Sequence, residues 1–213
     1  MQTYLFDFDG TLVDSMPSFI AGVIKELDKN NCQYDDDIIK IITPLGFAGT
    51  ADYFIKTFGL DISIEELVQA FEDNMANEYF YNISAKSNVI KVLKELKDNG
   101  ASLNILTASP HVTLDACLKR LKIFDLFDNV WSCEDFSTTK ANPEIYKLVA
   151  QKLNVNVKDV LFLDDNLNAN LVAKSAGMKV CGVFDESSVD YIEQMKSICD
   201  FYIYDFDELL KIK

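Results

Sequence analysis

Two aspartates, Asp7 and Asp9, stand two residues apart directly after a short apolar run that begins at Thr3. If this run is a buried strand, its C-terminal end brings both carboxylates to the edge of a sheet, and side-chain alternation places them on one face. Two like charges this close are unfavourable unless a cation or a shared proton lies between them. A polar strand end would account for the turn at Gly10-Thr11, but not for two acids after a buried run, so the pattern favours a chemical site.

Three later segments carry polar groups at comparable places. Thr107 ends an apolar run, Lys140 precedes an expected helix, and Asp164-Asp165 end another apolar run. Each has an ordinary explanation when taken alone: a hydroxyl bonded to the backbone, a solvated lysine and a helix N-cap. Parallel strands present their carboxyl ends at one edge of a sheet. The order of these groups on successive strand ends therefore predicts that they meet Asp7 in one crevice.

Phosphoryl transfer is the chemistry that these groups can perform. Asp7 would attack phosphorus and form an aspartyl-phosphate, while Asp9 would protonate the leaving oxygen and then activate water. A hard dication held by the acids would have octahedral oxygen ligation, which suits Mg²⁺. Lys140 and Thr107 would bind the other phosphoryl oxygens. Main-chain N–H groups are expected to help at Gly10, Thr11 and Ala108.

The elements that must position these groups follow two patterns along the chain. Residues 16–84 have helical periodicity only, whereas helices and strands alternate from about residue 86. Strands are expected at 3–7, 102–107, 129–132, 160–163, 179–183 and 201–203. Helices are expected at about 18–30, 38–42, 51–58, 63–81, 86–99, 112–121, 143–153, 167–176, 188–198 and 205–211. We therefore predict an α/β fold: a parallel-sheet core of residues 1–15 and 85–213 with helices on both faces, and an inserted all-α cap at 16–84.

Composition narrows the classes of partner. The formal charge of −14 over 213 residues argues against nucleic acid or an anionic membrane surface as a partner. The first residues lack the features of a signal peptide, and no run approaches the roughly 18 apolar residues that a bilayer crossing needs. The five cysteines show no Cys-x-x-Cys spacing and are expected to be free thiols. We expect a cytoplasmic protein, with a monomer as the default and a dimer as the alternative.

The segment Asp7–Ser15, Asp-Phe-Asp-Gly-Thr-Leu-Val-Asp-Ser, resembles the first motif of the haloacid dehalogenase-like superfamily, most of whose members are phosphatases. The other three motifs follow in order, so the resemblance covers essentially the whole chain. It implies a Rossmann-like sheet with a helical cap after the first motif. It also implies a nucleophile at Asp7, a general acid/base at Asp9, and phosphoryl binding by Thr107 and Lys140. By the same resemblance, the Mg²⁺ ligands are Asp7, the main-chain carbonyl of Asp9 and Asp165, with Asp164 as a further ligand or a supporting neighbour.

The chain departs from the pattern of the superfamily at Ala169, where relatives often have Asp, Asn or Gly. Asn168 or Asn170 can substitute there, so the sequence does not decide which side chain supports the metal ligands at this position. Relatives also often have proline where this chain has Ala141, and we expect little effect on the chemistry. Asp9 is present, whereas the dehalogenases that name the superfamily lack this second acid. Hydrolysis of a carbon–halogen bond is therefore not expected.

Three functions compete. The leading one is a Mg²⁺-dependent phosphatase of a small phosphorylated metabolite. A β-phosphoglucomutase would use the same aspartyl-phosphate but return the phosphate to a sugar. A phospho-accepting switch of the receiver type fits less well. Receiver domains carry paired acids after the first strand, the acceptor aspartate at a later strand end and no inserted cap, whereas here paired acids reappear after the fourth expected strand and a cap is expected. The segment Pro44–Thr50 is either a loop that closes over the crevice and selects the substrate or an exposed linker, and His111 is expected to start a helix.

Overall fold

The computed structural model describes residues 2–35, 37–42 and 45–212. The chain divides into two compact units. One, here called the sheet unit, contains the chain up to Asp14 and from Ser84 onward; the other, the helical unit, is Ser15–Ile83. Each boundary lies one residue before the position expected from the sequence. That the helical unit serves as a cap stays a prediction.

The sheet unit is built on six parallel strands in the order β3-β2-β1-β4-β5-β6. The strands are β1 (Thr3–Phe6), β2 (Ser102–Thr107), β3 (Asn129–Ser132), β4 (Val160–Asp164), β5 (Lys179–Val183) and β6 (Phe201–Ile203). Strand β1 lies between β2 and β4, and all four of its residues are buried. A continuous apolar run is what a strand buried on both faces requires. The parallel α/β sheet expected from the sequence is confirmed.

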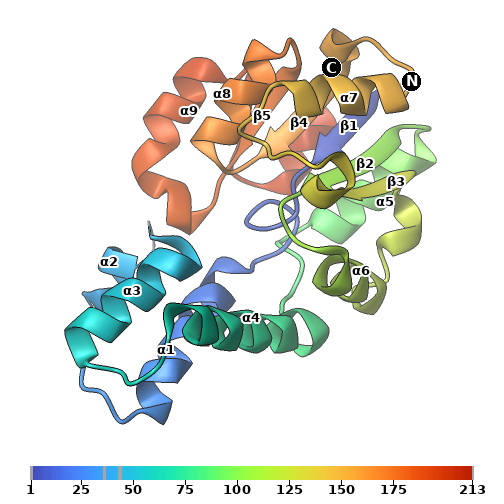
Figure 1. The fold of residues 1–213 in the computed structure, drawn as a ribbon. Helices are drawn as coiled ribbons and strands as arrows, with labels where there is room; N and C mark the ends of the chain where they lie inside the picture. Colours follow the sequence, from blue (N-terminus) through green and yellow to red (C-terminus); the bar gives the residue numbers. More distant parts are fainter. Residues whose placement is uncertain (1, 36, 43–44, 213) are drawn as a thin grey trace. The chain divides into compact units, whose positions relative to one another are not determined.

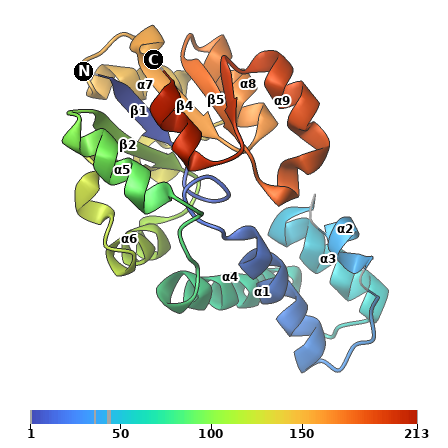
Figure 2. The same cartoon turned by 180° about the vertical axis from the view of Figure 1, so that it is seen from behind.

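Helices cover both faces of the sheet, as predicted (Figures 1 and 2). Leu5 packs in a buried cluster with residues of α7 and α8, while the ring of the adjacent Phe6 stacks 6.1 Å from the ring of Phe206. These contacts follow from the alternation of side chains along β1. The helices of this unit are α5 (Val89–Asp98), α6 (His111–Arg120), α7 (Glu144–Lys152), α8 (Leu167–Ser175) and α9 (Ile192–Ile198). The 3₁₀ helices are η1 (Phe124–Leu126), η2 (Cys133–Phe136), η3 (Val157–Asp159), η4 (Glu186–Tyr191) and η5 (Phe206–Lys211).

The helical unit contains α1 (Met16–Lys29), α2 (Ile38–Ile42), α3 (Gly46–Phe58) and α4 (Ile64–Tyr81). Its buried cluster includes Leu27, Phe54 and Phe71, one from each long helix. Ser63 and Glu66 form the capping box expected at the start of α4. None of the described helices of the chain combines the length and the hydropathy that a bilayer crossing requires.

Some helix boundaries differ from the expected ones. Helix α3 begins at Gly46, so a loop through Thr50 is wrong, and Pro44 lies outside the described residues. Helix α5 begins only at Val89, because Asn88 before it has a left-handed backbone with φ of 62°. The side chain of Asn88 donates hydrogen bonds to both carboxylate oxygens of Asp205, which fixes this unusual start. The helix expected at 188–198 is a 3₁₀ turn followed by α9, and the last helix is wholly 3₁₀.

Candidate active site

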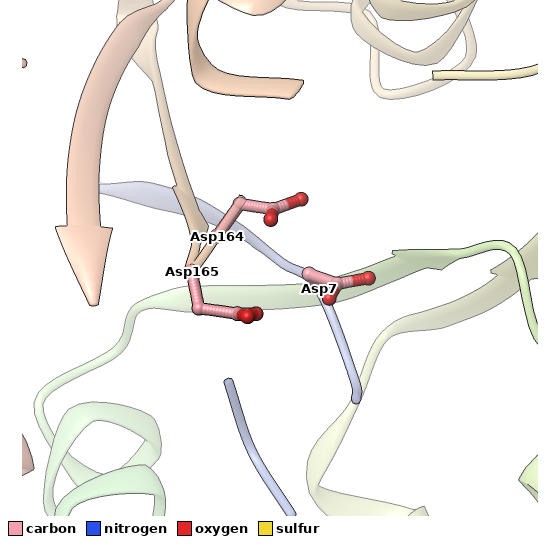
Figure 3. A group of neighbouring side chains, drawn as sticks. All are labelled: Asp7, Asp164 and Asp165. Atoms are coloured by element: carbon pink, nitrogen blue, oxygen red, sulfur yellow. The ribbon is translucent and has the colours of Figure 1, made fainter. Parts of the chain in front are cut away.

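Three buried carboxylates meet at the carboxyl ends of β1 and β4. Asp7 directly follows β1, and its main-chain N–H donates to the carbonyl of Leu163 in β4 at 2.8 Å. Asp164 ends β4 and Asp165 follows it. One oxygen from each carboxylate lies within 4.8 Å of the others, and the exposed fractions of the three residues are 5%, 0% and 9%. Figure 3 shows the three side chains extending from these two neighbouring strand ends.

Lys140 is the cation that balances this cluster. Its Nζ donates to Oδ1 of Asp7 at 2.6 Å and to Oδ2 of Asp164 at 2.7 Å. The lysine side chain is only 15% exposed. The hydroxyl of Tyr146, a buried residue of α7, donates to the main-chain carbonyl of Lys140 at 3.1 Å. The packed core therefore fixes the backbone from which the ammonium reaches the two acids.

The protonation balance of the cluster reflects its burial. Burial raises the pKa of Asp7 well above its usual value; the charge of Lys140 acts in the opposite direction, and the neighbouring acids raise the pKa further. Burial, with the charges of Asp164 and Asp185, raises the pKa of Asp165 to about 7. Burial alone would lower the pKa of Lys140, but the charges of Asp164 and Asp7 raise it well above its usual value. Three acids thus share one ammonium, which favours a further cation.

The turn after the first strand is fitted closely to Asp165. Thr11 donates from its hydroxyl to Oδ1 of Asp165 at 3.0 Å, and Oγ1 of Thr11 accepts the main-chain N–H of Asp165 at 3.1 Å. Gly10 has φ of +73°, and a Cβ there would lie 2.6 Å from Oδ2 of Asp165. The N–H of Gly10 donates to the carbonyl of Val13 at 3.0 Å. The sequence predicted that this N–H binds a phosphoryl oxygen, but here it is already hydrogen-bonded within the turn. Gly10 instead permits the close approach of the turn to the carboxylate.

The end of β2 supplies hydroxyl groups beside Asp9. Ser109 donates from Oγ to Oδ2 of Asp9 at 2.5 Å. The main-chain N–H of Ser109 donates to Oγ1 of Thr107 at 3.1 Å. Thr107 is buried, and because its oxygen is the acceptor in that bond, its own proton is available to a ligand. Ala108 between them is exposed, and the contact of its main-chain N–H with a phosphoryl oxygen stays a prediction.

The two asparagines beside Ala169 lie in different environments. Asn170 is fully buried and donates from Nδ2 to the main-chain carbonyl of Asp164 at 2.8 Å, whereas Asn168 is exposed. Asn166 donates its main-chain N–H to Oδ1 of Asp164 at 2.7 Å, while Lys140 donates to Oδ2 of the same carboxylate. Both oxygens of Asp164 therefore have protein donors. Each oxygen retains a lone pair, so whether Asp164 binds the metal or supports its ligands stays open.

The donor set fits a magnesium ion. Within the part of the chain that the structure describes, Oδ2 of Asp7 and Oδ2 of Asp165 accept no hydrogen bond. Both are hard carboxylate oxygens in a buried cluster that carries excess negative charge. Mg²⁺ prefers such oxygens and is commonly bound through one or two carboxylates.

Sequence reasoning missed two residues that the structure brings to the site. Ser109 was signalled only by its place two residues after Thr107. Lys86 donates from Nζ to the carbonyl of Gly10 at 2.6 Å, and its other partners lie 98 and 99 residues away in the sequence. No local sequence pattern predicts such a contact. His111, by contrast, begins α6 as expected, with ring nitrogens 3.0 Å from Asp115 and 2.9 Å from Asp135.

Comparison with known proteins identifies the family. The model of the haloacid dehalogenase-like hydrolase family matches residues 4–183. The chain therefore belongs to this family of hydrolases, which confirms the resemblance seen in its four motifs. It is similar to the pyrophosphatase PpaX of Bacillus cereus (strain Q1), with 27% identity over 219 residues that cover 100% of this chain and 96% of the relative.

Two solved structures have the same fold. One is a Thermotoga maritima protein provisionally named a β-phosphoglucomutase, with a TM-score of 0.85, 21% identity, and coverage of 99% of this chain and 97% of that one. The other is YfnB of Bacillus subtilis, solved bound to magnesium, with a TM-score of 0.81, 18% identity and the same coverage of both chains. At these identities the likeness shows the fold alone.

Proposed function

We propose that this protein is a Mg²⁺-dependent phosphatase of a small phosphorylated metabolite, and that it forms an aspartyl-phosphate on Asp7. One observation carries the proposal: a buried carboxylate at the end of the central strand is bonded to Lys140 and lies within 4.8 Å of two further acids. Membership of a hydrolase family and the similarity to a pyrophosphatase support it.

Asp7 acts as the nucleophile, and the hydrogen bond from Lys140 to its Oδ1 fixes the orientation of the carboxylate. Its oxygen forms a bond to phosphorus while the bond from phosphorus to the leaving oxygen breaks, and Asp9 gives that oxygen a proton. Asp9 then takes a proton from water as the water attacks phosphorus. This second displacement releases phosphate and restores the Asp7 carboxylate. Ser109 fixes the orientation of Asp9 through the hydrogen bond of 2.5 Å.

Positive charge and hydrogen-bond donors stabilise the transferring group. Lys140 uses two of its three N–H bonds on Asp7 and Asp164, which leaves the third for a phosphoryl oxygen. Thr107 offers its hydroxyl proton to another oxygen. The Mg²⁺ ion that Asp7, Asp165 and the carbonyl of Asp9 would hold supplies charge neutralisation to the phosphoryl oxygens when bound.

The substrate class is that of a phosphoric monoester or a small pyrophosphate. The second option enters because PpaX, the relative with 27% identity, is a pyrophosphatase. A cap that encloses the substrate, as expected for the helical unit, favours a small molecule and keeps water from the intermediate. The net charge of −14 supports a protein that works without a nucleic acid or an anionic membrane partner. We further propose a cytoplasmic protein that is a monomer by default, with a dimer as the alternative.

Release of inorganic phosphate tests the proposal. The panel contains phosphoglycolate, sugar phosphates, nucleoside monophosphates and inorganic pyrophosphate, each with Mg²⁺ and with a chelator. We expect metal-dependent release from one or a few compounds. Conversion of a sugar phosphate to its isomer, dependent on a sugar bisphosphate and without net phosphate release, would instead identify a mutase. A phosphoprotein that persists for many minutes would point to a switch.

A further inference from the structure

Lys86 holds the turn that follows β1 through both its side chain and its main chain. Its Nζ donates to the carbonyl of Gly10 at 2.6 Å, to the carbonyl of Phe184 at 2.5 Å and to Oδ2 of Asp185 at 3.0 Å. All three N–H bonds of the ammonium are thus used. The main-chain N–H of Lys86 donates to the carbonyl of Leu12 at 3.0 Å. The lysine side chain is 19% exposed, so these bonds are largely shielded from water.

The peptide that Lys86 holds is the one packed against Asp165. At Gly10 the distance from a Cβ to Oδ2, Cγ and Oδ1 of Asp165 would be 2.6–2.8 Å, so no side chain separates the turn from the carboxylate. The next residue, Thr11, hydrogen-bonds the other oxygen of the same carboxylate at 3.0 Å. A shift of the Gly10 peptide therefore changes both the space around Oδ2 of Asp165 and the hydrogen bond to Oδ1.

We propose that Lys86 is a positioning residue for the metal site: by holding the carbonyl of Gly10, it fixes the turn that places the carboxylate of Asp165 for Mg²⁺. This inference rests on the metal site of the proposed function. Groups that orient metal ligands through one intermediate contact affect metal affinity roughly 10- to 100-fold when they are removed. Lys86 makes no hydrogen bond to the carboxylates of Asp7 and Asp165, and its positional effect on the site passes through the Gly10 peptide.

Removal of Lys86 should change the affinity for Mg²⁺ in opposite directions, depending on whether the lost charge or the lost position of the turn dominates. An ammonium near a cation site opposes binding of the cation, so its removal alone would strengthen Mg²⁺ binding. Removal would also leave Asp185, which is 5% exposed, without its ion-pair partner, and that adds negative charge beside the cluster. Weaker binding in a Lys86 variant therefore reports the lost position of the turn and not the lost charge.

The test is calorimetric titration of metal-free protein with MgCl₂, together with the melting temperature with and without Mg²⁺. For Lys86→Met we expect a dissociation constant for Mg²⁺ about tenfold higher than that of the wild type. Lys86→Arg, which keeps a donor to the carbonyl, should recover part of the affinity. Lys91→Met is the matched control, because Lys91 lies five residues further on and pairs with Asp207 on the surface. It should bind Mg²⁺ like the wild type.

Unchanged or tighter Mg²⁺ binding by a folded Lys86→Met protein would overturn the inference. If that variant does not fold, Lys86→Gln, neutral and too short to reach all three acceptors, carries the same expectation. A wild type that binds no Mg²⁺ would overturn the metal site and this inference together. A wild type that binds Mg²⁺ but releases no phosphate from any compound would overturn the proposed function and leave the role of Lys86 testable.

Discussion

Lys140 and Asp7 are 133 residues apart in the sequence, yet Nζ of the lysine donates to Oδ1 of the aspartate at 2.6 Å. The same ammonium donates to Asp164 at 2.7 Å, so one cation bridges the ends of β1 and β4. The charge of the lysine opposes the rise in the pKa of Asp7 that burial and the neighbouring acids cause. The bond to Oδ1 also leaves the second oxygen of Asp7 for chemistry.

Replacement of the proposed nucleophile should stop turnover without unfolding the protein. Asp7→Asn keeps the size of the side chain but removes the attacking oxygen anion, so we expect phosphate release to fall by roughly 10³-fold or more. The melting temperature should stay close to that of the wild type, because the variant loses an ion pair but also a like charge. Asp98→Asn, at an exposed carboxylate that ends α5, is the control and should retain activity. Near-normal activity of Asp7→Asn would exclude the aspartyl-phosphate mechanism.

Loss of the bridging ammonium should be costly for folding. Lys140→Met leaves Asp7 and Asp164 buried without their shared cation, and breaking such a pair typically costs about 3–5 kcal/mol. Because the folded state raises the pKa of Lys140, its contribution is fully present at pH 7 and is lost only as the pH rises through that raised value. Urea unfolding of metal-free protein at pH 7 measures the difference. Lys147→Met, at an exposed ion pair of α7, should change stability little, and equal stability of the two variants would contradict the assignment.

The protonation of Asp165 should make the stability of the metal-free protein depend on pH. The folded state raises its pKa from 3.8 to about 7, so the folded protein binds more protons than the unfolded chain between these values. This contribution is present in full at low pH and is lost as the pH rises to about 7. Asp165→Asn should therefore melt higher than the wild type at about pH 8 with chelator, and the difference should shrink towards pH 4.

The same variant tests the metal site by a second route. Mg²⁺ should raise the melting temperature of the wild type, because a ligand that binds only the folded state stabilises it. It should leave Asp165→Asn unchanged, since an amide is a weaker ligand than a carboxylate for a hard dication. An equal Mg²⁺-induced shift in both proteins would remove Asp165 from the set of ligands.

Gly10 should be intolerant of a side chain for two separable reasons. An alanine there needs a left-handed backbone, which costs roughly 1–2 kcal/mol, and its Cβ would also lie 2.6 Å from Oδ2 of Asp165. Gly59 has a similar φ of +67° but nothing within 4 Å of a Cβ, so Gly59→Ala measures the backbone cost alone. Thermal unfolding should show Gly10→Ala to be the less stable variant by a further 1–3 kcal/mol or so, the usual cost of overpacking. Equal losses would mean that the contact with Asp165 is not tight.

Much of the architecture is predictable from local patterns. The run Thr3–Phe6 is apolar throughout, because β1 is buried on both faces, and the helical stretch between Ser15 and Ile83 lacks strand periodicity. The six strands and their parallel arrangement follow from the alternation of helices and strands along the chain. The expected starts of α3 and α5 differ from the observed ones. For α5 the reason is the left-handed backbone of Asn88, which is stabilised by Asp205, and no local pattern reveals that contact.

The sequence by itself therefore determined the strand ends and the acids on them, because burial and alternation are properties of neighbouring residues. Only the tertiary structure decided which groups touch. It assigned the hydroxyl of Thr11 to Asp165 across 154 residues and the ammonium of Lys86 to Gly10 across 76. Such contacts depend on which strand ends and turns the parallel sheet brings together, and on the conformations of the connecting segments. The sequence alone does not distinguish a lysine that faces solvent from one that, like Lys86, donates three hydrogen bonds inside the fold.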